Sequence, residues 1–393
     1  MGTGRGDRQP SPQREPRGGG GSQAGDGGSL LDPAETEKLV AAAQSDVDAL
    51  RAEFLFAPPV RLHKPLAALL EDSRDLPILF LYLNVLLTTV PAAVALFCFF
   101  PTATRPLPHW LGAAYLVANC VAYLGRFMLS LHYSQHRRLF RRGLGALNFV
   151  APVLYAPIFG VPSGMYYLHH CLMHHCGNNC AAHDASSTEH YQRDSFPAFL
   201  LYWLRFAVGG WVEVPARCVQ YRRWGLLAGS LVAEAACFGA TAAAWKLNPR
   251  ATIWVLLLPY LITSLALMFG NWSQHIFVDP THPHDSYRLT YNCAGVHDNR
   301  LSYNDGYHIL HHLNGRLHWS EMPGRMVATL EQHAAHDALC FVGIHFFQVG
   351  AAVMTGKYAY LLRHLSRYSA KLAAMDDAQL TQMLRARLVP LNA

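Results

Sequence analysis

Four long runs of apolar residues limit the fold of this chain more than any other feature of its sequence. The runs cover residues 77–100, 110–131, 225–245 and 251–272. Each is long enough for a helix that crosses a lipid bilayer, which needs about 20 predominantly apolar residues. Because a short segment joins the two members of each pair, the runs predict two transmembrane hairpins. The expected fold is therefore an all-α integral membrane protein with four transmembrane helices.

The composition of the whole chain agrees with this interpretation. Hydrophobic residues make up 51% of the 393 residues and charged residues only 15%, against about 25% charged residues in typical soluble domains. The formal net charge of +6 is small and its charges are scattered, which argues against nucleic-acid binding. The nine cysteines form no compact disulfide framework and are expected to be free thiols in a reducing compartment.

Changes in composition divide the chain into four regions. Residues 1–30 have almost no apolar side chains and are expected to be disordered. A helix is predicted to begin at Asp32–Pro33, an N-cap residue followed by proline at the first helical position. The predicted regions are the disordered tail (1–30), an amphipathic N-terminal helix with a pre-membrane segment (31–76), a membrane domain (77–323), and a C-terminal cytosolic helical cap and tail (324–393). Within the last region, residues 334–360 are expected to form an amphipathic cap.

Two further apolar runs, 145–168 and 198–215, are interrupted by Pro and Gly or by charged residues. We interpret them as interfacial or re-entrant segments, so that all longer polar segments share one face of the membrane. The arginines near the membrane on that face are Arg126, Arg137, Arg138, Arg141, Arg142, Arg217, Arg222 and Arg223. The opposite turns carry only Arg105, Lys246 and Arg250. The positive-inside rule therefore predicts that the shared face is cytosolic.

Histidine is frequent and clustered in this chain, with 22 residues in total. Four groups fall on the predicted cytosolic face, and most contain a spacing of four, which puts two side chains on one side of a helix. The groups are His132 and His136, then His170, His174 and His175, then Asn271 and His275, and last His308, His311 and His312. A single such pair is usually a feature of a helix surface, but four groups on one face are not expected by chance.

The number of histidines predicts the kind of site. Neutral imidazole is the commonest ligand of iron, copper, zinc and nickel in proteins. One zinc ion uses three or four protein ligands, so nine histidines indicate two metal ions with open positions. Carboxylates are expected to orient the rings and balance the charge, and the candidates, each of which could also be a solvated loop residue, are Asp184, Glu189, Asp298 and Asp305. Among the histidines outside the groups, His183 is the best candidate for a further role at the site.

The order HxxxH, HxxxHH and HxxHH, with hairpins between and around these motifs, resembles the membrane fatty acid desaturase and hydroxylase superfamily over residues 78–323. The resemblance implies two irons, held by His132, His136, His170, His174, His175, His275, His308, His311 and His312. It also places Asn271 at a position that contacts one iron through water in acyl-CoA desaturases. The spacings within the first two motifs differ from those of the acyl-CoA enzymes, and these departures leave the subgroup open.

The resemblance also implies an activity. A membrane desaturase would use O2 to introduce a double bond into the acyl chain of an acyl-CoA or a lipid, held in a tunnel between the spans. A lipid or alkyl-chain hydroxylase of the same superfamily is the first alternative, and a metal-binding membrane scaffold or sensor without enzymatic activity is the second. No catalytic residue is predicted beyond the metal ligands, since the protein's task would be to hold the metals, exclude water and select the carbon that reacts.

Electrons are expected to come from a separate carrier, because the sequence shows no cytochrome b5 motif, dinucleotide fingerprint or iron–sulfur cysteine pattern. The resemblance suggests cytochrome b5 at the cytosolic face of the endoplasmic reticulum, with ferredoxin and a plastid membrane as the alternatives. A basic docking surface is expected, because such carriers are usually acidic and complementary charges speed encounter. The candidates, which could instead anchor anionic headgroups, are Arg137, Arg138, Arg141 and Arg142.

Overall fold

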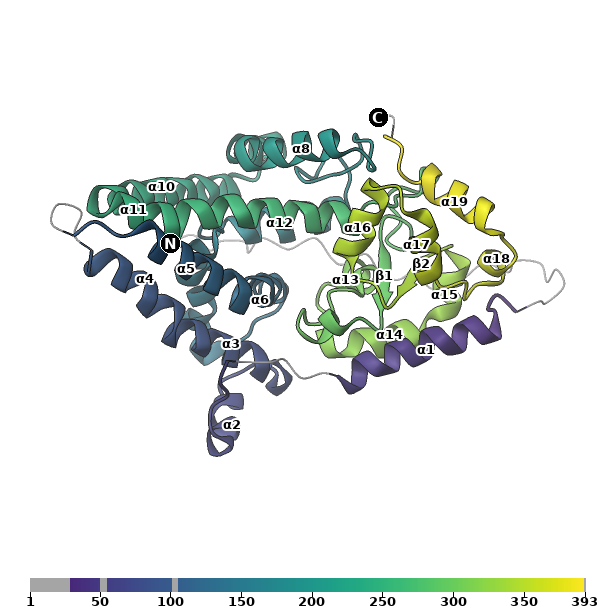
Figure 1. The fold of residues 1–393 in the computed structure, drawn as a ribbon, viewed down its shortest axis with the longest axis horizontal. Helices are drawn as coiled ribbons and strands as arrows, with labels where there is room; N and C mark the ends of the chain where they lie inside the picture. The colour runs from purple at the N-terminus through teal and green to yellow at the C-terminus, as the bar shows by residue number, and fades with distance from the viewer. Residues whose placement is uncertain (1–28, 50–54, 101–104, 392–393) are drawn as a thin grey trace, which may run out of the picture.

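The computed structural model describes residues 29–49, 55–100 and 105–391. Nearly all of the predicted disordered tail lies outside these ranges. Long apolar helices form one side of the molecule, and short helices around a small sheet form the other side (Figure 1). The long helix α12 (Leu258–Gln274) runs from the first part into the second.

In the described part of the chain, five helices are long and apolar enough to cross a membrane. They are Ser73–Cys98, His109–His136, Arg142–Phe159, Trp224–Leu247 and Pro249–Gln274. Four of them overlap the four predicted spans. The fifth, Arg142–Phe159, overlaps one of the two runs that we predicted to be interfacial or re-entrant, and the other run, 198–215, contributes none of the five.

The predicted spans are built from several shorter helical elements. The first contains α3 (Leu76–Leu87) and α4 (Thr89–Cys98); the second contains α5 (His109–Asn119), the π-helical turn Cys120–Leu124 and α6 (Gly125–His136); the third is α10 (Trp224–Leu247); the fourth contains α11 (Pro249–Thr252), the π-helical turn Ile253–Leu257 and α12. Only Ser230 of α10 is buried. The apolar surface of this helix therefore faces outward, as expected for a helix in contact with lipid.

The two hairpin turns lie side by side. The Asn248 side-chain amide donates to the carbonyl oxygen of Phe100 at 2.8 Å, and the Arg250 guanidinium donates to that of Leu107 at 3.1 Å. Both turns are thus at one end of the helices, whereas His136 and His275 lie at the other end. This is the arrangement expected of two parallel hairpins.

The segment Arg142–Phe159 is irregular and ends in a tight reversal. It consists of a 3-10 helix (Arg142–Phe149), a π-helix (Val150–Tyr155) and a second 3-10 helix (Ala156–Phe159). Gly160 follows with a φ of 78°, and a Cβ atom there would lie 2.2 Å from the carbonyl oxygen of Pro259 on α12. Only glycine permits both this backbone conformation and this contact.

The second part of the molecule contains a two-stranded parallel sheet, β1 (Tyr291–Ala294) and β2 (Leu339–Val342), with Tyr291 paired to Leu339. The described chain is mostly helical, as predicted, and this small sheet is a departure from an all-α fold. The strand β2 lies within 334–360, the segment that was predicted to form an amphipathic cap, together with helices. Both strands are short and almost fully buried, and a short apolar run of this kind shows no alternation that would distinguish a strand from a buried helix.

The described part of the chain contains twelve further α-helices. They are α1 (Pro33–Asp48), α2 (Val60–Ala67), α7 (His175–Gly177), α8 (Phe196–Leu204), α9 (Gly210–Gln220), α13 (His308–Leu313), α14 (Met322–Ala328), α15 (Leu330–Ala335), α16 (Phe346–Met354), α17 (Tyr358–His364), α18 (Ala370–Ala373) and α19 (Asp377–Ala386). The first of these begins as predicted, since the Asp32 carboxylate accepts a hydrogen bond from the Glu35 backbone amide. Helix α1 packs along α14 through a buried face that includes Leu39 and Ala43.

Candidate metal centre

The first two histidine motifs lie on neighbouring helical segments. His132 and His136 are one turn apart at the end of α6. The segment Tyr167–His174 is a π-helix, whose hydrogen bonds join residues five apart and therefore align side chains at that spacing. His170 and His175 consequently face the same way, with their Nε2 atoms 3.1 Å apart. The ring of His174 stacks on that of His170 at a centroid distance of 5.5 Å, but its nitrogen atoms do not join those of His170 and His175.

The third motif and the isolated histidine complete the arrangement. Helix α13 carries His308 and His312 on one face and His311 on another. His275 follows α12 directly as its C-cap residue. The second and third motifs each contribute histidines to two different groups, so the nine predicted ligands form two groups. These groups are adjacent, because the rings of His175 in one and His312 in the other stack at a centroid distance of 4.8 Å.

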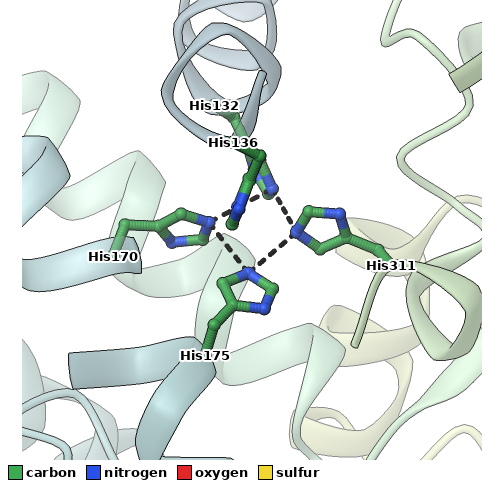
Figure 2. A group of neighbouring side chains, drawn as sticks. All are labelled: His132, His136, His170, His175 and His311. Atoms are coloured by element: carbon green, nitrogen blue, oxygen red, sulfur yellow. Dashed lines mark hydrogen bonds between the residues drawn. The ribbon is translucent and has the colours of Figure 1, made fainter. Parts of the chain in front are cut away.

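The first group contains five histidines whose nitrogen atoms lie within 4.8 Å of one another (Figure 2): His132, His136, His170, His175 and His311. The Nε2 atom of His311 lies 2.5 Å from that of His132 and 2.8 Å from that of His175. Burial lowers the pKa of His170, His175 and His311 well below the ordinary value, so extra protons between these rings are disfavoured. A shared cation would satisfy their converging lone pairs.

The second group contains four histidines, which meet the same distance criterion: His174, His275, His308 and His312. The Nε2 atoms of His275, His308 and His312 are buried and have no hydrogen-bond partner. A buried polar atom without a partner is costly, and three of them at one point fit a metal ion. Burial also lowers the pKa of His308 and His312 well below the ordinary value, which favours the neutral form that binds metal.

Other side chains fix the orientation of these rings. The Nδ1 atom of His275 donates to the carbonyl oxygen of Leu289 at 3.1 Å, and that of His312 donates to Asn178 Oδ1 at 3.1 Å. The Nδ1 atom of His174 lies 2.7 Å from Asp184 Oδ2. Since Nδ1 carries the proton in each ring, the Nε2 lone pair is left free for a metal.

Asp305 lies between the two groups. Its Oδ1 is 3.8 Å from His132 Nδ1, and its Oδ2 accepts a hydrogen bond from Gln274 at 2.8 Å. The same Gln274 amide is 3.1 Å from His308 Nδ1. Burial raises the pKa of Asp305 to about 7, and two cations beside it would favour the ionised form and be partly neutralised by it.

The structure separates the other predicted residues into two kinds. Asp184 and Asp305 contact or approach ligand rings, whereas Asp298 is exposed and Glu189 lies instead beside Cys180 and His284. His183 belongs to neither histidine group, and its exposed ring pairs with the Tyr221 hydroxyl at 2.7 Å. The Asn271 side-chain amide donates to the Tyr202 hydroxyl and to the carbonyl oxygen of Ser186, so the predicted contact with an iron through water stays a prediction.

Sequence reasoning missed two residues that hold ligand rings. Gln274 immediately precedes His275 in the NWSQH motif, and this position beside a predicted ligand was a signal that could have identified it. Asn178 lies in a polar loop and carries no pattern that could have identified it. Both act through contacts between segments more than 30 residues apart in the chain.

A comparison with protein-family models gives one match, to "Fatty acid desaturase", over residues 106–342. The match covers more than half of the chain and includes all nine histidines of the two groups. No curated protein and no solved structure matches the chain.

Proposed function

This chain belongs to the fatty acid desaturase family, whose members are oxidoreductases, and we propose that it is an O2-dependent desaturase of acyl chains with an iron in each histidine group. The observation that carries the proposal is the division of nine imidazoles into groups of five and four, with three unpartnered Nε2 atoms in the second. When bound, the irons would supply the redox chemistry that reduces O2 and removes hydrogen from an unactivated methylene.

The protein's own residues perform three tasks in this proposal. His132, His170 and their partners hold the metals through neutral rings. Asp184 and Asn178 fix the rings of His174 and His312 through Nδ1, so that the ligand atoms are in place before a metal binds. Six of the nine histidines are buried and the other three are partly buried, which would help to keep bulk water away from the reacting carbon.

A cleft beside the second motif supports an acyl substrate with an anionic end. Its lining includes Met173 and Gly177 from the histidine-bearing segment, Leu226 from α10, and the arginines Arg217 and Arg223. The cleft therefore has an apolar wall close to the metal centre and cationic groups near the beginning of an apolar helix. A phosphate group at one end of an acyl-CoA or a phospholipid matches this distribution of charge.

The proposed topology has four spans, with Arg142–Phe159 re-entrant and the metal centre on the cytosolic side of the endoplasmic reticulum. His136 precedes this segment and His170 follows it, and their rings are only 5.1 Å apart. A segment that crossed the membrane completely would separate these two histidines. Tags near residue 141 and residue 222 are expected on the same side, and a tag at Asn248 on the opposite side.

The function is tested by expressing the full chain in cells and profiling their lipids by mass spectrometry, with iron measured in the purified protein. A desaturase gives products lighter by two hydrogens, in an O2-dependent reaction, and contains close to two irons per chain. Products with an added oxygen would identify a hydroxylase instead. Active protein that contains zinc and no iron would refute the proposal. Protein that contains zinc in place of iron and forms no product would identify a scaffold or sensor.

A further inference from the structure

A third group of metal-binding side chains lies outside the nine histidines. Cys180 Sγ, a carboxylate oxygen of Glu189 and a ring nitrogen of His284 all lie within 4.8 Å of one another. Neither the family nor the proposed function assigns a role to these residues. We propose that they form a zinc site, distinct from the two histidine groups.

The local backbone explains how two of these ligands meet. The segment that carries the second motif ends at Gly177, and Asn178 and Asn179 follow in the left-handed conformation, with φ values of 51° and 60°. Asparagine adopts this conformation more readily than most residues. The Asn179 side chain then accepts a hydrogen bond from the Thr188 backbone amide at 2.9 Å. This contact closes the loop and brings Cys180 beside Glu189.

Glu189 provides an independent indication that the site binds a cation. Its side chain is only 8% exposed, and its Oε2 accepts a hydrogen bond from the Ala181 backbone amide at 2.7 Å. Its Oε1 is buried without a hydrogen-bond partner, although His284 Nδ1 lies 3.3 Å away. An ionised carboxylate oxygen buried in this way is unfavourable, and a cation between Glu189, His284 and Cys180 removes the penalty.

The chemistry of the three ligands selects the ion. A thiolate, an imidazole and a carboxylate form a mixed sulfur, nitrogen and oxygen set, which suits Zn2+ and is unsuited to Mg2+ or Ca2+, since these prefer oxygen alone. His284 is about half exposed, with 51% of its side-chain surface accessible. Solvent can therefore supply the fourth ligand of a tetrahedral ion.

The site is connected to the second histidine group through Asn178. The Asn178 amide donates to the carbonyl oxygen of His284 at 2.6 Å, while its Oδ1 accepts from His312 Nδ1. A zinc ion would join the 178–189 loop to the segment that follows α12.

The test is metal analysis of the full-length protein purified in detergent after expression with iron and zinc. The wild-type protein is expected to contain one zinc per chain in addition to its iron. His284→Ala removes an exposed ligand without opening the core and is expected to lose that zinc while keeping its iron. His190→Ala, which changes an exposed histidine next to Glu189, is the matched control and should keep both metals. Equal zinc contents in His284→Ala and wild type would overturn the proposal.

Cobalt provides a second measurement that does not depend on zinc content. Co2+ added to the zinc-depleted protein is expected to give a thiolate-to-cobalt charge-transfer band, which disappears in Cys180→Ser and persists in Cys98→Ser. Cys180→His is expected to restore zinc binding without the band. A band that survives in Cys180→Ser contradicts the assignment. The iron content reports separately on the two histidine groups, so failure of the zinc site and failure of the proposed function can be distinguished.

Discussion

At the scale of single residues, each histidine can bind a metal only through the ring nitrogen that carries no proton. His174 and His311 belong to different groups, and no neighbouring group can replace a lost metal bond. We therefore expect His174→Ala and His311→Ala each to reduce iron well below two per chain and to abolish product formation, while the protein still inserts into the membrane. Iron analysis and lipid profiling check this expectation. Normal activity in either variant would remove its histidine from the site, and the exposed His190→Ala should behave as wild type.

His333 lies outside the metal groups, and its burial leads us to expect that the free energy of unfolding depends on pH. Its buried ring donates to the carbonyl oxygen of Thr329 and accepts from the Asn292 amide, and burial lowers its pKa from 6.5 to about 4. As the pH falls from 6.5 towards 4, the unfolded chain binds a proton that the folded chain does not. Stability should therefore fall with falling pH across this window, by about 1 kcal/mol between pH 7.5 and 5.5.

His333→Gln removes this titrating group and keeps polar atoms near the same partners. Thermal unfolding in detergent at several pH values should show a flatter dependence for the variant than for the wild-type protein. Parallel curves for the two proteins would contradict the interpretation of His333.

At the scale of elements, α1 holds the segment that leads to the third histidine motif. The buried Asp46 carboxylate accepts hydrogen bonds from the Gly295 backbone amide at 2.8 Å, the Asn299 amide at 2.9 Å and the Tyr307 hydroxyl at 2.6 Å. Asp46→Ala leaves all three donors without this acceptor, at a cost of about 1–3 kcal/mol for each buried group that stays unsatisfied.

We expect Asp46→Ala to lower the free energy of unfolding by roughly 3 kcal/mol and to reduce iron binding, because Tyr307 directly precedes His308. The exposed Asp48→Ala on the same helix is the control and should change neither quantity. Thermal unfolding and iron analysis of the two variants measure the effect, and equal behaviour would show that α1 does not support the centre.

The irregular segment 142–164 offers a matched pair of glycines. Gly160 and Gly164 have φ values of 78° and 76°, but a Cβ at Gly160 would collide with the Pro259 backbone, whereas at Gly164 it would meet only Ala233 Cβ at 3.8 Å. Gly164→Ala should cost about 1 kcal/mol for its left-handed backbone. Gly160→Ala should cost roughly 2–4 kcal/mol, since overpacking is added to the strain. Similar losses of thermal stability in the two variants would show that the segment does not contact α12 this closely.

The elements also show how far sequence reasoning reaches. The long spans and the start of α1 could be predicted because hydropathy and an Asp–Pro cap are local signals. The division of the histidines into two groups could not be predicted from the sequence. It depends on a π-helix at Tyr167–His174, which brings residues five apart to the same side. The pairing of β1 with β2 could not be predicted either, since it joins residues 291–294 to 339–342 and depends on tertiary burial.

At the scale of the whole molecule, we expect a separate electron carrier to dock where the chain leaves the second span. The structure revises the predicted surface there. Arg137 pairs with Asp72 at 3.2 Å and is partly buried, so its charge is partly neutralised within the protein. Arg138, Arg141 and Arg142 are exposed and follow His136 closely in the chain. These three arginines form the basic surface that we expect an acidic carrier to contact.

Reversal of two of these charges tests the surface. Arg138→Glu with Arg141→Glu should slow donor-driven turnover by about tenfold or more at low salt, because electrostatic steering raises encounter rates by 10–10³. Added salt should slow the unmodified enzyme in the same way, since the Debye length is about 8 Å at physiological ionic strength. Iron content should not change. The matched control is Arg61→Glu with Lys64→Glu, two exposed charges on α2 away from the first motif, which should leave turnover nearly unaffected. Equal rates for the two double variants would refute this docking surface, and turnover sustained by NADPH alone would refute the separate carrier.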